Sequence, residues 1–474
     1  MNGSQQPVID FLSDPASHGL PGAALERIET HCSIVFLVAD RACKLKRAIR
    51  FASLDYTTVE RRRAACEAEL RLNTRAAPEL YQAVRAITAS AGGLEFDGAG
   101  PALDHVVVMR RFDQADLFEH MAEAGRLTPQ LMRDLGETIA RFHAAAPVTW
   151  DFGGADGIRR MLADNDRELA FAGAALDGAP FATLSRRAHD TLDRVADLLD
   201  TRQSDGHVRR CHGDLRLANI CLYGNRPTLF DCIEFADDIG CIDVLYDLAF
   251  LLMDLHLRGR DDLGNIVFNA WLDRTRETDG LRALPLFLSA RAATRSYALA
   301  AASHRRGDPE EARALLARAR RHVEAAMDFL DARPPVLVML GGSDDRARVE
   351  TAARLAARVP PAPGARVLRA GAAGEAVWRE ALAVLLAGVP VLLEGRFGDS
   401  DERNATVALP PGIRLLPFWL GDPPPGLDPR IWQAAEAGPD GLAAMADAAA
   451  DAARCGASSV GCGHAAQPGP EAIR

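Results

Sequence analysis

The chain has 474 residues, of which 48% are hydrophobic and 25% charged, and its formal net charge is −10. This length and apolar content allow two to four domains with substantial cores. The acidic balance, without a basic stripe, argues against a nucleic-acid-binding protein.

The N-terminus and the cysteines favour a cytoplasmic protein. The first 20 residues contain no basic segment followed by an apolar stretch, so no secretory signal is expected. The longest apolar run, 381–393, is interrupted by Gly388 and Pro390 and is too short to cross a bilayer. The number of cysteines, 9, is odd, and this favours reduced thiols over a framework of disulfides. Four of them lack metal-binding spacing, and we expect small buried side chains: Cys211, Cys221, Cys232 and Cys241.

Only two lysines occur in the chain, Lys44 and Lys46. They lie in the alternating segment 42–47, which we expect to pair through a tight turn with the apolar strand 33–38. Side chains alternate along a strand, so both lysines should face the same side. Lysine is a compact point charge whereas arginine is a wide planar fork, so the pair suggests a narrow site such as one for nucleotide phosphates.

Helical and strand patterns follow in chain order. We expect a charged helix over 58–76 and strands over 80–112 that end in the buried run 106–109. Beyond residue 115 the pattern is helical, apart from a strand-like interlude at 208–235. The amphipathic stretches are 131–143, 158–172, 183–200 and the patterns between 242 and 330.

A domain boundary is expected at Pro334 and Pro335. A new apolar strand begins at Val336, and strand and helix patterns then alternate up to a patternless tail from about Gly456. We therefore expect one domain over 1–333 and a second, α/β domain over 334–474.

The segment 211–220 contains the motif H-G-D-x-x-x-x-N, with His212, Asp214 and Asn219, and Asp231 closes the next apolar strand. This set suits Mg²⁺-dependent phosphoryl transfer. One carboxylate aligns the acceptor hydroxyl and takes its proton, while an amide oxygen and a second carboxylate hold Mg²⁺ against the nucleotide phosphates. The alternative is a structural turn rich in Asp and Asn. The lysine strand upstream and the aspartate downstream favour the chemical interpretation.

This motif, together with Phe230 and Asp231, resembles the catalytic loop and metal-binding aspartate of aminoglycoside phosphotransferases and their choline- and fructosamine-kinase relatives. The tracts 29–37, 44–46 and 54–63 resemble the branch in which a P-loop ATP-binding domain follows. The resemblance is strong to about residue 330 and weak after it. It implies an α+β protein-kinase-like domain, with a strand-rich small lobe and a helical large lobe, followed by an α/β P-loop NTPase-like domain.

The resemblance also implies roles for the loop residues. Asp214 would be the catalytic base, and Asn219 and Asp231 the Mg²⁺ ligands, with ATP as the phosphoryl donor. Arg216 lies two residues after Asp214, where a γ-phosphate contact is reasonable. His212 would buttress the loop, although a core histidine is an equal alternative.

The nucleotide-binding residues remain open at two positions. Lys44 or Lys46 would contact the α- and β-phosphates, and Glu67 or Glu69 on the following helix would pair with that lysine. Met109 would precede the hinge between the lobes. One departure from the kinase pattern is that no G-x-G-x-x-G precedes the lysine strand.

The C-terminal domain departs further from its expected motif. A working P-loop reads G-x-x-x-x-G-K-[ST], and its lysine and hydroxyl reach the phosphates and Mg²⁺. From Gly342 this chain reads G-S-D-D-R-A-R-V, so the second glycine, the lysine and the hydroxyl are missing. Asp344 and Asp345 place negative charge where phosphates would dock. We expect a P-loop-like fold that has lost nucleotide binding, with an atypical live site as the alternative.

These features predict an ATP-dependent small-molecule kinase, a phosphotransferase with an alcohol group as acceptor, and no nucleic-acid or membrane partner. Acidic residues near the loop would suit an amine-bearing acceptor, although a solvated acidic face explains them as well; they are Asp237, Asp238, Asp254, Asp261 and Asp262. The alternative function is a regulatory pseudokinase that holds ATP without turnover and engages a partner through its second domain. Aspartates 243 and 247 resemble the family's helix-start residues that brace the catalytic loop.

Overall fold

The computed structural model describes residues 4–51, 54–176, 180–370, 374–397, 409–422 and 432–454. The predicted tail from about Gly456 lies outside these ranges. The chain forms two compact units. The first consists of Met1–Gly153 and Gln203–Leu248, and the second of Gly154–Arg202 and Ala249–Arg474. The domain boundary expected after residue 333 stays a prediction.

A six-stranded antiparallel sheet, in the order β1-β2-β3-β8-β6-β7, forms the first part of the first unit. Its strands are β1 (Leu25–Glu29), β2 (Ser33–Val38), β3 (Arg41–Lys46), β6 (Tyr81–Ser90), β7 (Gly93–Phe96) and β8 (Ala102–Arg110). Helix α1 (Gln6–Ser13) covers one face, where Val8 and Leu12 pack against Cys43 and Leu45 of β3. The intervening residues of β3, Lys44 and Lys46, therefore share the opposite face, as predicted from the alternation.

Helix α2 (Val59–Asn73) packs against β8 and carries the predicted charged pattern. Its first turn is capped by the hydroxyl of Thr58, which accepts a hydrogen bond of 3.3 Å from the amide of Arg61. The helix buries Cys66, Glu69 and Leu72 along one stripe. Residues three apart lie on the same side of a helix, so the carboxylate of Glu69 belongs to the buried face. Preceding it is the short hairpin of β4 (Arg50–Phe51) and β5 (Leu54–Asp55).

The rest of the first unit carries the predicted catalytic loop. It contains α3 (Phe118–Glu123), α4 (Pro129–Ala145), β9 (Val208–Arg210), β10 (Ile220–Tyr223), β11 (Arg226–Leu229), α7 (Asp237–Gly240), β12 (Cys241–Asp243) and the start of α8 (Val244–Leu257). β10 and β11 form a hairpin whose turn residues, Gly224 and Asn225, both have positive φ, of 56° and 58°. The two ends of the hairpin lie side by side, and there the amide of Phe230 donates to the carbonyl of Asn219 at 3.0 Å.

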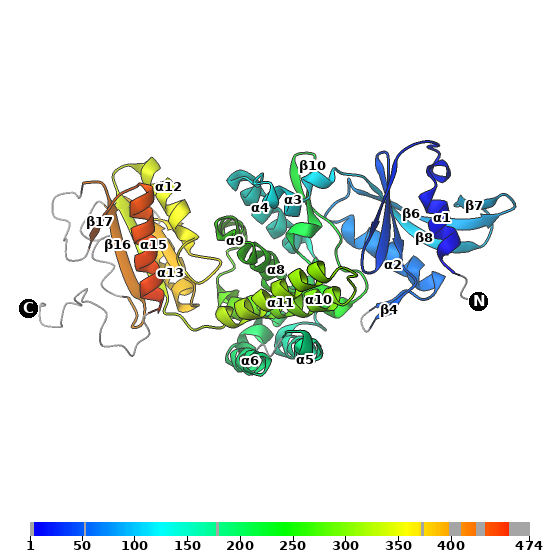
Figure 1. The fold of residues 1–474 in the computed structure, drawn as a ribbon. Coiled ribbons are helices and arrows are strands. Elements are labelled where there is room, and N and C mark those ends of the chain that lie inside the picture. Colours follow the sequence, from blue (N-terminus) through cyan, green and yellow to red (C-terminus); the bar gives the residue numbers. More distant parts are fainter. Residues whose placement is uncertain are drawn as a thin grey trace, which may run out of the picture. The chain divides into compact units, whose positions relative to one another are not determined.

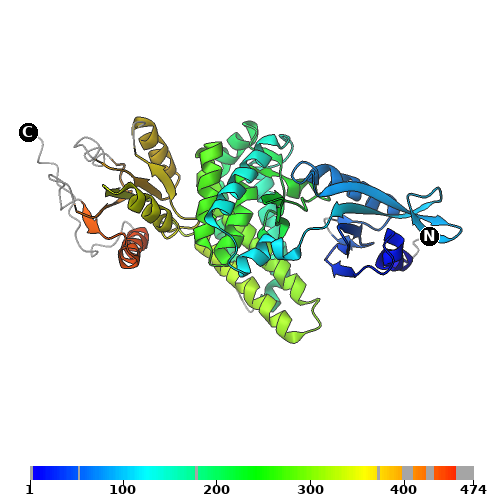
Figure 2. The same ribbon diagram turned by 90° about the horizontal axis from the view of Figure 1, so that it is seen from above.

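The second unit begins with helices. They are α5 (Gly154–Ala172), α6 (Phe181–Ser204), α9 (Asp261–Thr275), α10 (Leu284–Ser303) and α11 (Pro309–Phe329). Helix α10 packs along α11 and against α5 (Figures 1 and 2). Over the described ranges, no helix has the length and apolar character needed to cross a bilayer.

A parallel sheet follows within the second unit, in the order β14-β15-β13-β16-β17. Its strands are β13 (Val336–Gly342), β14 (Arg366–Arg369), β15 (Val391–Glu394), β16 (Arg414–Leu420) and β17 (Gln433–Ala435). Helices α12 (Asp345–Ala356) and α15 (Pro439–Arg454) pack together on the face that carries Val336, Val338 and Leu340 (Figure 1). Helix α13 (Gly374–Leu386) packs against β14 and β15. The predicted alternation of strands and helices beyond residue 334 is confirmed over 336–394, where β13, α12, β14, α13 and β15 follow one another.

Candidate active site

Both lysines of β3 reach the same carboxylate of α2. Lys44 Nζ donates a hydrogen bond of 2.8 Å to Glu69 Oε1, and Lys46 Nζ forms an ion pair with Glu69 Oε2. The other predicted candidate, Glu67, has a side chain that is 48% exposed and pairs with Arg63. Of the two alternatives that the sequence left open, the structure thus places Glu69 at the lysines.

The buried side chains of Lys44, Lys46 and Glu69 keep one another ionised. Burial alone would raise the pKa of Glu69, but Lys44 and Lys46 outweigh burial and lower the pKa to about 2. Burial lowers the pKa of Lys44, and the attraction of Asp231 and Glu69 more than reverses this, so its pKa lies well above the usual value. An ammonium group and a carboxylate therefore both stay ionised at neutral pH.

The two lysines differ in their second partner and in their access to solvent. Lys44 also pairs with Asp231, whose side chain is 41% exposed. Lys46 pairs instead with Glu234 and is only 1% exposed. Lys44 is thus the lysine whose charge lies next to an open carboxylate, whereas Lys46 is enclosed.

Glu234 and Tyr56 were not identified as site residues from the sequence. The hydroxyl of Tyr56 donates to Glu234 Oε1 at 2.5 Å, and Lys46 Nζ lies 5.4 Å from the centre of the Tyr56 ring. Burial raises the pKa of Tyr56, so the hydroxyl remains a donor at neutral pH. The one feature of the sequence that could have indicated Glu234 is its position three residues after Asp231. These contacts tie the segment after Asp231 to β3.

Asp231 itself has φ 63°, in the left-handed region that few residues other than glycine adopt. Neighbouring contacts hold it there. Its amide donates to the hydroxyl of Tyr81 at 3.1 Å, and the amide of Cys232 donates to Asn73 Oδ1 at 2.8 Å. In this conformation the carboxylate of Asp231 contacts Lys44.

The carboxylate of Asp214 is held by two side chains from its own loop. Arg216 donates to both of its oxygens, with Nε at 2.7 Å and Nη2 at 2.8 Å. Asn219 Nδ2 donates to Asp214 Oδ2 at 2.8 Å and to the Asp214 carbonyl oxygen at 2.8 Å. The guanidinium of Arg216, predicted to contact a γ-phosphate, thus forms a bidentate pair with Asp214. The amide of Asn219 points its NH₂ group at Asp214, so a predicted metal contact of this side chain would use Oδ1.

His212 joins this loop to the strand that leads to Asp231. The histidine is fully buried, and its Nε2 bonds the carbonyl oxygen of Phe230 at 2.9 Å. Its Nδ1 accepts a hydrogen bond of 3.3 Å from the amide of Asp214. A carbonyl oxygen can only accept, so the imidazole carries its proton on Nε2. These contacts are those of a buttress, and the ring has no direct access to a substrate.

Asp247 braces the same loop from α8. Its carboxylate accepts hydrogen bonds from the amides of His212 at 3.1 Å and Gly213 at 2.9 Å, and it contacts His143 Nε2 at 3.0 Å. Gly213 has φ 85°, and a Cβ atom there would lie 3.0 Å from Ile233. The bracing role predicted for Asp247 is confirmed by these contacts.

Met109 lies near the end of β8, opposite Tyr81 of β6 and Ala42 of β3. It is half-buried and packs with Phe112 and Phe230 in one apolar cluster. The segment 110–113 follows directly, where the sequence predicts a hinge. A contact of Met109 with a nucleotide stays a prediction.

The donor atoms of this site are of the type that Mg²⁺ prefers. Asp231 offers a partly exposed carboxylate and Asn219 an amide oxygen, and oxygen ligands are those that Mg²⁺ prefers. A second cluster of ligand atoms, from His143, Cys211 and Asp247, is buried. Asp247 already accepts two backbone amides there, so we interpret that cluster as part of the loop's support.

Most of the acidic residues that would suit an amine-bearing acceptor already have basic neighbours. Four of the five form ion pairs with nearby side chains: Asp237 with Arg210, Asp254 with Arg258, Asp261 with His256 and Asp262 with Arg260. They therefore offer little free negative charge to an acceptor.

The chain is similar to several known proteins. The chain is 29% identical over 319 residues to uncharacterized proteins of Mycobacterium tuberculosis and Mycobacterium bovis, and the match covers 66% of this chain but 61% of those proteins. A choline kinase from Cryptosporidium parvum aligns with a TM-score of 0.43 at 9% identity, over 69% of this chain and 96% of that one. A choline/ethanolamine kinase family protein from Mesorhizobium loti aligns with a TM-score of 0.41 at 15% identity, over 68% of this chain and 98% of that one.

The family comparison is more direct. The sequence profile of the phosphotransferase enzyme family matches residues 46–284, about half of the chain. The match includes the motif with Asp214 and Asn219, the aspartate at 231 and the helix that carries Glu69. The match begins at Lys46, the last residue of β3, so it does not include Lys44. The chain therefore belongs to the phosphotransferase enzyme family.

Proposed function

We propose that this protein is a kinase that transfers the γ-phosphoryl group of ATP to a hydroxyl group of a small cytoplasmic molecule. The observation that carries the proposal is the contact of Lys44 with both Glu69 and Asp231. Phosphoryl transfer requires a fixed positive charge for the donor phosphates and carboxylates for the metal. His212 and Asn219 connect this group, through Phe230, to the loop that carries Asp214.

Asp214 is the proposed catalytic base. Its carboxylate would hold the acceptor hydroxyl and take its proton as the acceptor oxygen forms a bond to the γ-phosphorus. The bond from phosphorus to the bridging oxygen of ATP breaks, and ADP leaves with that oxygen. Arg216 and Asn219 fix the carboxylate for this step, because they bond to both of its oxygens.

Lys44 is the proposed partner of the α- and β-phosphates, and Glu69 keeps it in place. Asn219 Oδ1 and Asp231 would hold Mg²⁺, which neutralises charge on the phosphates when it is bound. The proposed role of Arg216 at the γ-phosphate would require its guanidinium to bridge Asp214 and the phosphate, which its five donors permit.

We also propose that residues 334–474 form a P-loop-like domain without nucleotide binding. Arg348 fills the position where a P-loop would present its lysine. It is 4% exposed and donates to Glu394 Oε2 at 2.7 Å, to the Gly342 carbonyl at 2.7 Å and to Asp345 at 2.8 Å. Asp344 accepts hydrogen bonds from the amides of Arg346 at 2.9 Å and Ala347 at 3.0 Å. The helix N–H groups that could bind a phosphate thus already bind a carboxylate.

A screen of ATP consumption against aminoglycosides, amino sugars, amino alcohols and small sugars tests the proposed activity. ADP release that depends on one acceptor class supports a kinase. ATP binding without ADP release for any acceptor would favour the regulatory pseudokinase instead. The phosphorylated position can then be located on the product by NMR.

A further inference from the structure

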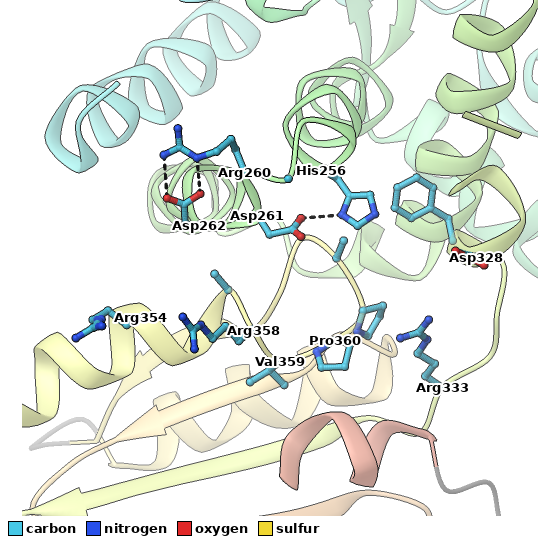
Figure 3. A pocket seen from close by; sticks show the side chains of 15 residues that line it. His256, Arg260, Asp261, Asp262, Asp328, Arg333, Arg354, Arg358, Val359 and Pro360 are labelled. Atoms are coloured by element: carbon cyan, nitrogen blue, oxygen red, sulfur yellow. Dashed lines mark hydrogen bonds and ion pairs between the residues drawn. The ribbon is translucent and has the colours of Figure 1, made fainter. Parts of the chain in front are cut away.

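The second unit contains a cavity of about 780 Å³ that the proposed phosphoryl transfer does not use (Figure 3). One wall comes from the turn between α8 and α9, with His256 and residues 259–262, and from the end of α11. The opposite wall comes from Arg333, from Arg354 in the last turn of α12, and from residues 357–362, which lead from α12 toward β14. A volume of this size suits a small organic ligand.

The cavity is rich in arginine, and we name it the arginine cavity. Four arginines line it: Arg260, Arg333, Arg354 and Arg358. Arg260 is paired with Asp262 at 2.9 Å, and Asp261 with His256 at 2.8 Å, as Figure 3 shows. Among the described residues, Arg333, Arg354 and Arg358 form no ion pair. Of the carboxylates that line the cavity, Asp328 alone lies outside these pairs. Three arginines against one carboxylate give the arginine cavity an excess of positive charge.

Polar contacts of α9 fix the two walls to each other. Asn265, one turn beyond Asp261, is 3% exposed and donates to the carbonyl oxygens of Pro363 at 3.0 Å and Ala365 at 2.9 Å. Asn269 Oδ1 accepts a hydrogen bond of 2.8 Å from the amide of Val367. Buried amides with satisfied hydrogen bonds specify a single arrangement. The arginine cavity is thus a preformed feature.

We propose that the arginine cavity binds a small molecule that carries two linked phosphate groups. Arg354 lies in the last turn of α12 and Arg358 in the turn that follows this helix, and Arg333 adds a third guanidinium from another segment. Guanidinium groups bind phosphate through paired N–H donors. Three unpaired guanidiniums exceed what one phosphate monoester needs and match a diphosphate. The remaining volume admits an organic group attached to it.

Inorganic pyrophosphate titrated into the full-length protein by calorimetry tests this proposal, with sulfate at equal ionic strength as the comparison anion. Wild-type protein should bind pyrophosphate more tightly than sulfate. The double variant Arg354→Ala/Arg358→Ala and the single variant Arg333→Ala should each lose about tenfold or more in affinity. Arg379→Ala should bind as wild type does, because this arginine is 75% exposed on α13, pairs with Glu375 and does not line the cavity.

Pyrophosphate bound at the proposed kinase site would persist in every arginine variant, so the two sites are distinguishable. Should the double alanine variant melt early, Arg354→Lys/Arg358→Lys replaces it, since lysine keeps the charge and loses the paired donors. This variant should bind pyrophosphate more weakly than wild type. Absence of pyrophosphate binding in wild type, equal affinity for sulfate, or wild-type affinity in the arginine-cavity variants would overturn the proposal.

Discussion

Lys44 Nζ contacts the carboxylate of Asp231, although 187 positions separate the two residues in the chain. The contact joins the strand that carries both lysines of the protein to the residue that follows the β10–β11 hairpin. Glu69 holds Lys44 from the other side at 2.8 Å. A cation between two carboxylates, one buried and one open, is suited to exchange its open partner for a phosphate.

The two lysines should respond differently to arginine. Lys44→Arg should lower ATP affinity and turnover about tenfold or more, because a planar fork replaces a point charge in a nearly closed space. Lys46→Arg should lower the melting temperature, because its larger side chain must fit a site that is 1% exposed. Calorimetry with ATP and thermal melting measure the two effects. Wild-type ATP affinity, turnover and melting temperature in both variants would contradict the roles assigned to Lys44 and Lys46.

Asp231→Ala should weaken Mg·ATP binding and turnover together, because a metal ligand acts in the ground state and in the transition state alike. The matched control is Asp237→Ala, which removes a 71% exposed carboxylate whose ion-pair distance to Arg210 is 3.5 Å. Titration of Mg·ATP into both variants gives the comparison. Wild-type affinity in Asp231→Ala would show that the metal site is wrongly assigned.

The buried carboxylate of Glu69 should make stability depend on pH. Its pKa is lowered from 4.5 to about 2 in the folded protein, so its contribution is complete above pH 4.5 and is lost as the pH falls toward 2. Glu69→Gln should cost about 3–5 kcal/mol at neutral pH, since it leaves buried ammonium groups short of a partner.

That cost should shrink as the pH falls below 4.5, the ordinary pKa of the side chain. Urea unfolding of wild type and Glu69→Gln at several pH values measures it. Glu67→Gln is the control, because its carboxylate is 48% exposed and should change stability little at any pH. A cost of Glu69→Gln that does not vary with pH would contradict the assigned ion pairs.

Arg348→Ala should leave ATP turnover unchanged and lower the melting temperature. Among the described residues, Glu394, which is 3% exposed, would then keep Arg369 as its one ion-pair partner, and a buried carboxylate that loses a partner destabilises the fold. Arg346→Ala is the control, since that side chain is 87% exposed on the same helix. A large loss of turnover in Arg348→Ala would move the nucleotide site into the C-terminal domain.

One part of the site followed from local periodicity. Alternation along 42–47 was enough to place Lys44 and Lys46 on one face, because the period of a strand is fixed by its backbone. The choice between Glu67 and Glu69 required the fold. The buried stripe of α2 includes Glu69, Arg62 and Asn73, so polarity does not mark its inner face.

Contacts distant in sequence could not be predicted. Lys46 meets Glu234 across 188 positions, and nothing in either local sequence specifies that pair. The orientation of Arg216 was open for another reason: a long side chain beside Asp214 can turn toward it or toward a ligand. The structure shows the first arrangement, with Nε 2.7 Å from Asp214 Oδ1.

The most direct test of the proposed kinase is Asp214→Asn, assayed for ATP binding and for acceptor-dependent ADP release. The amide keeps the size of the side chain and cannot take a proton, so turnover should fall by two or more orders of magnitude, roughly the contribution of a general base. ATP affinity should change by less than about tenfold, because the carboxylate orients the acceptor and does not hold the nucleotide. Turnover equal to that of the wild type would contradict the assignment of Asp214 as the base, and with it the kinase mechanism.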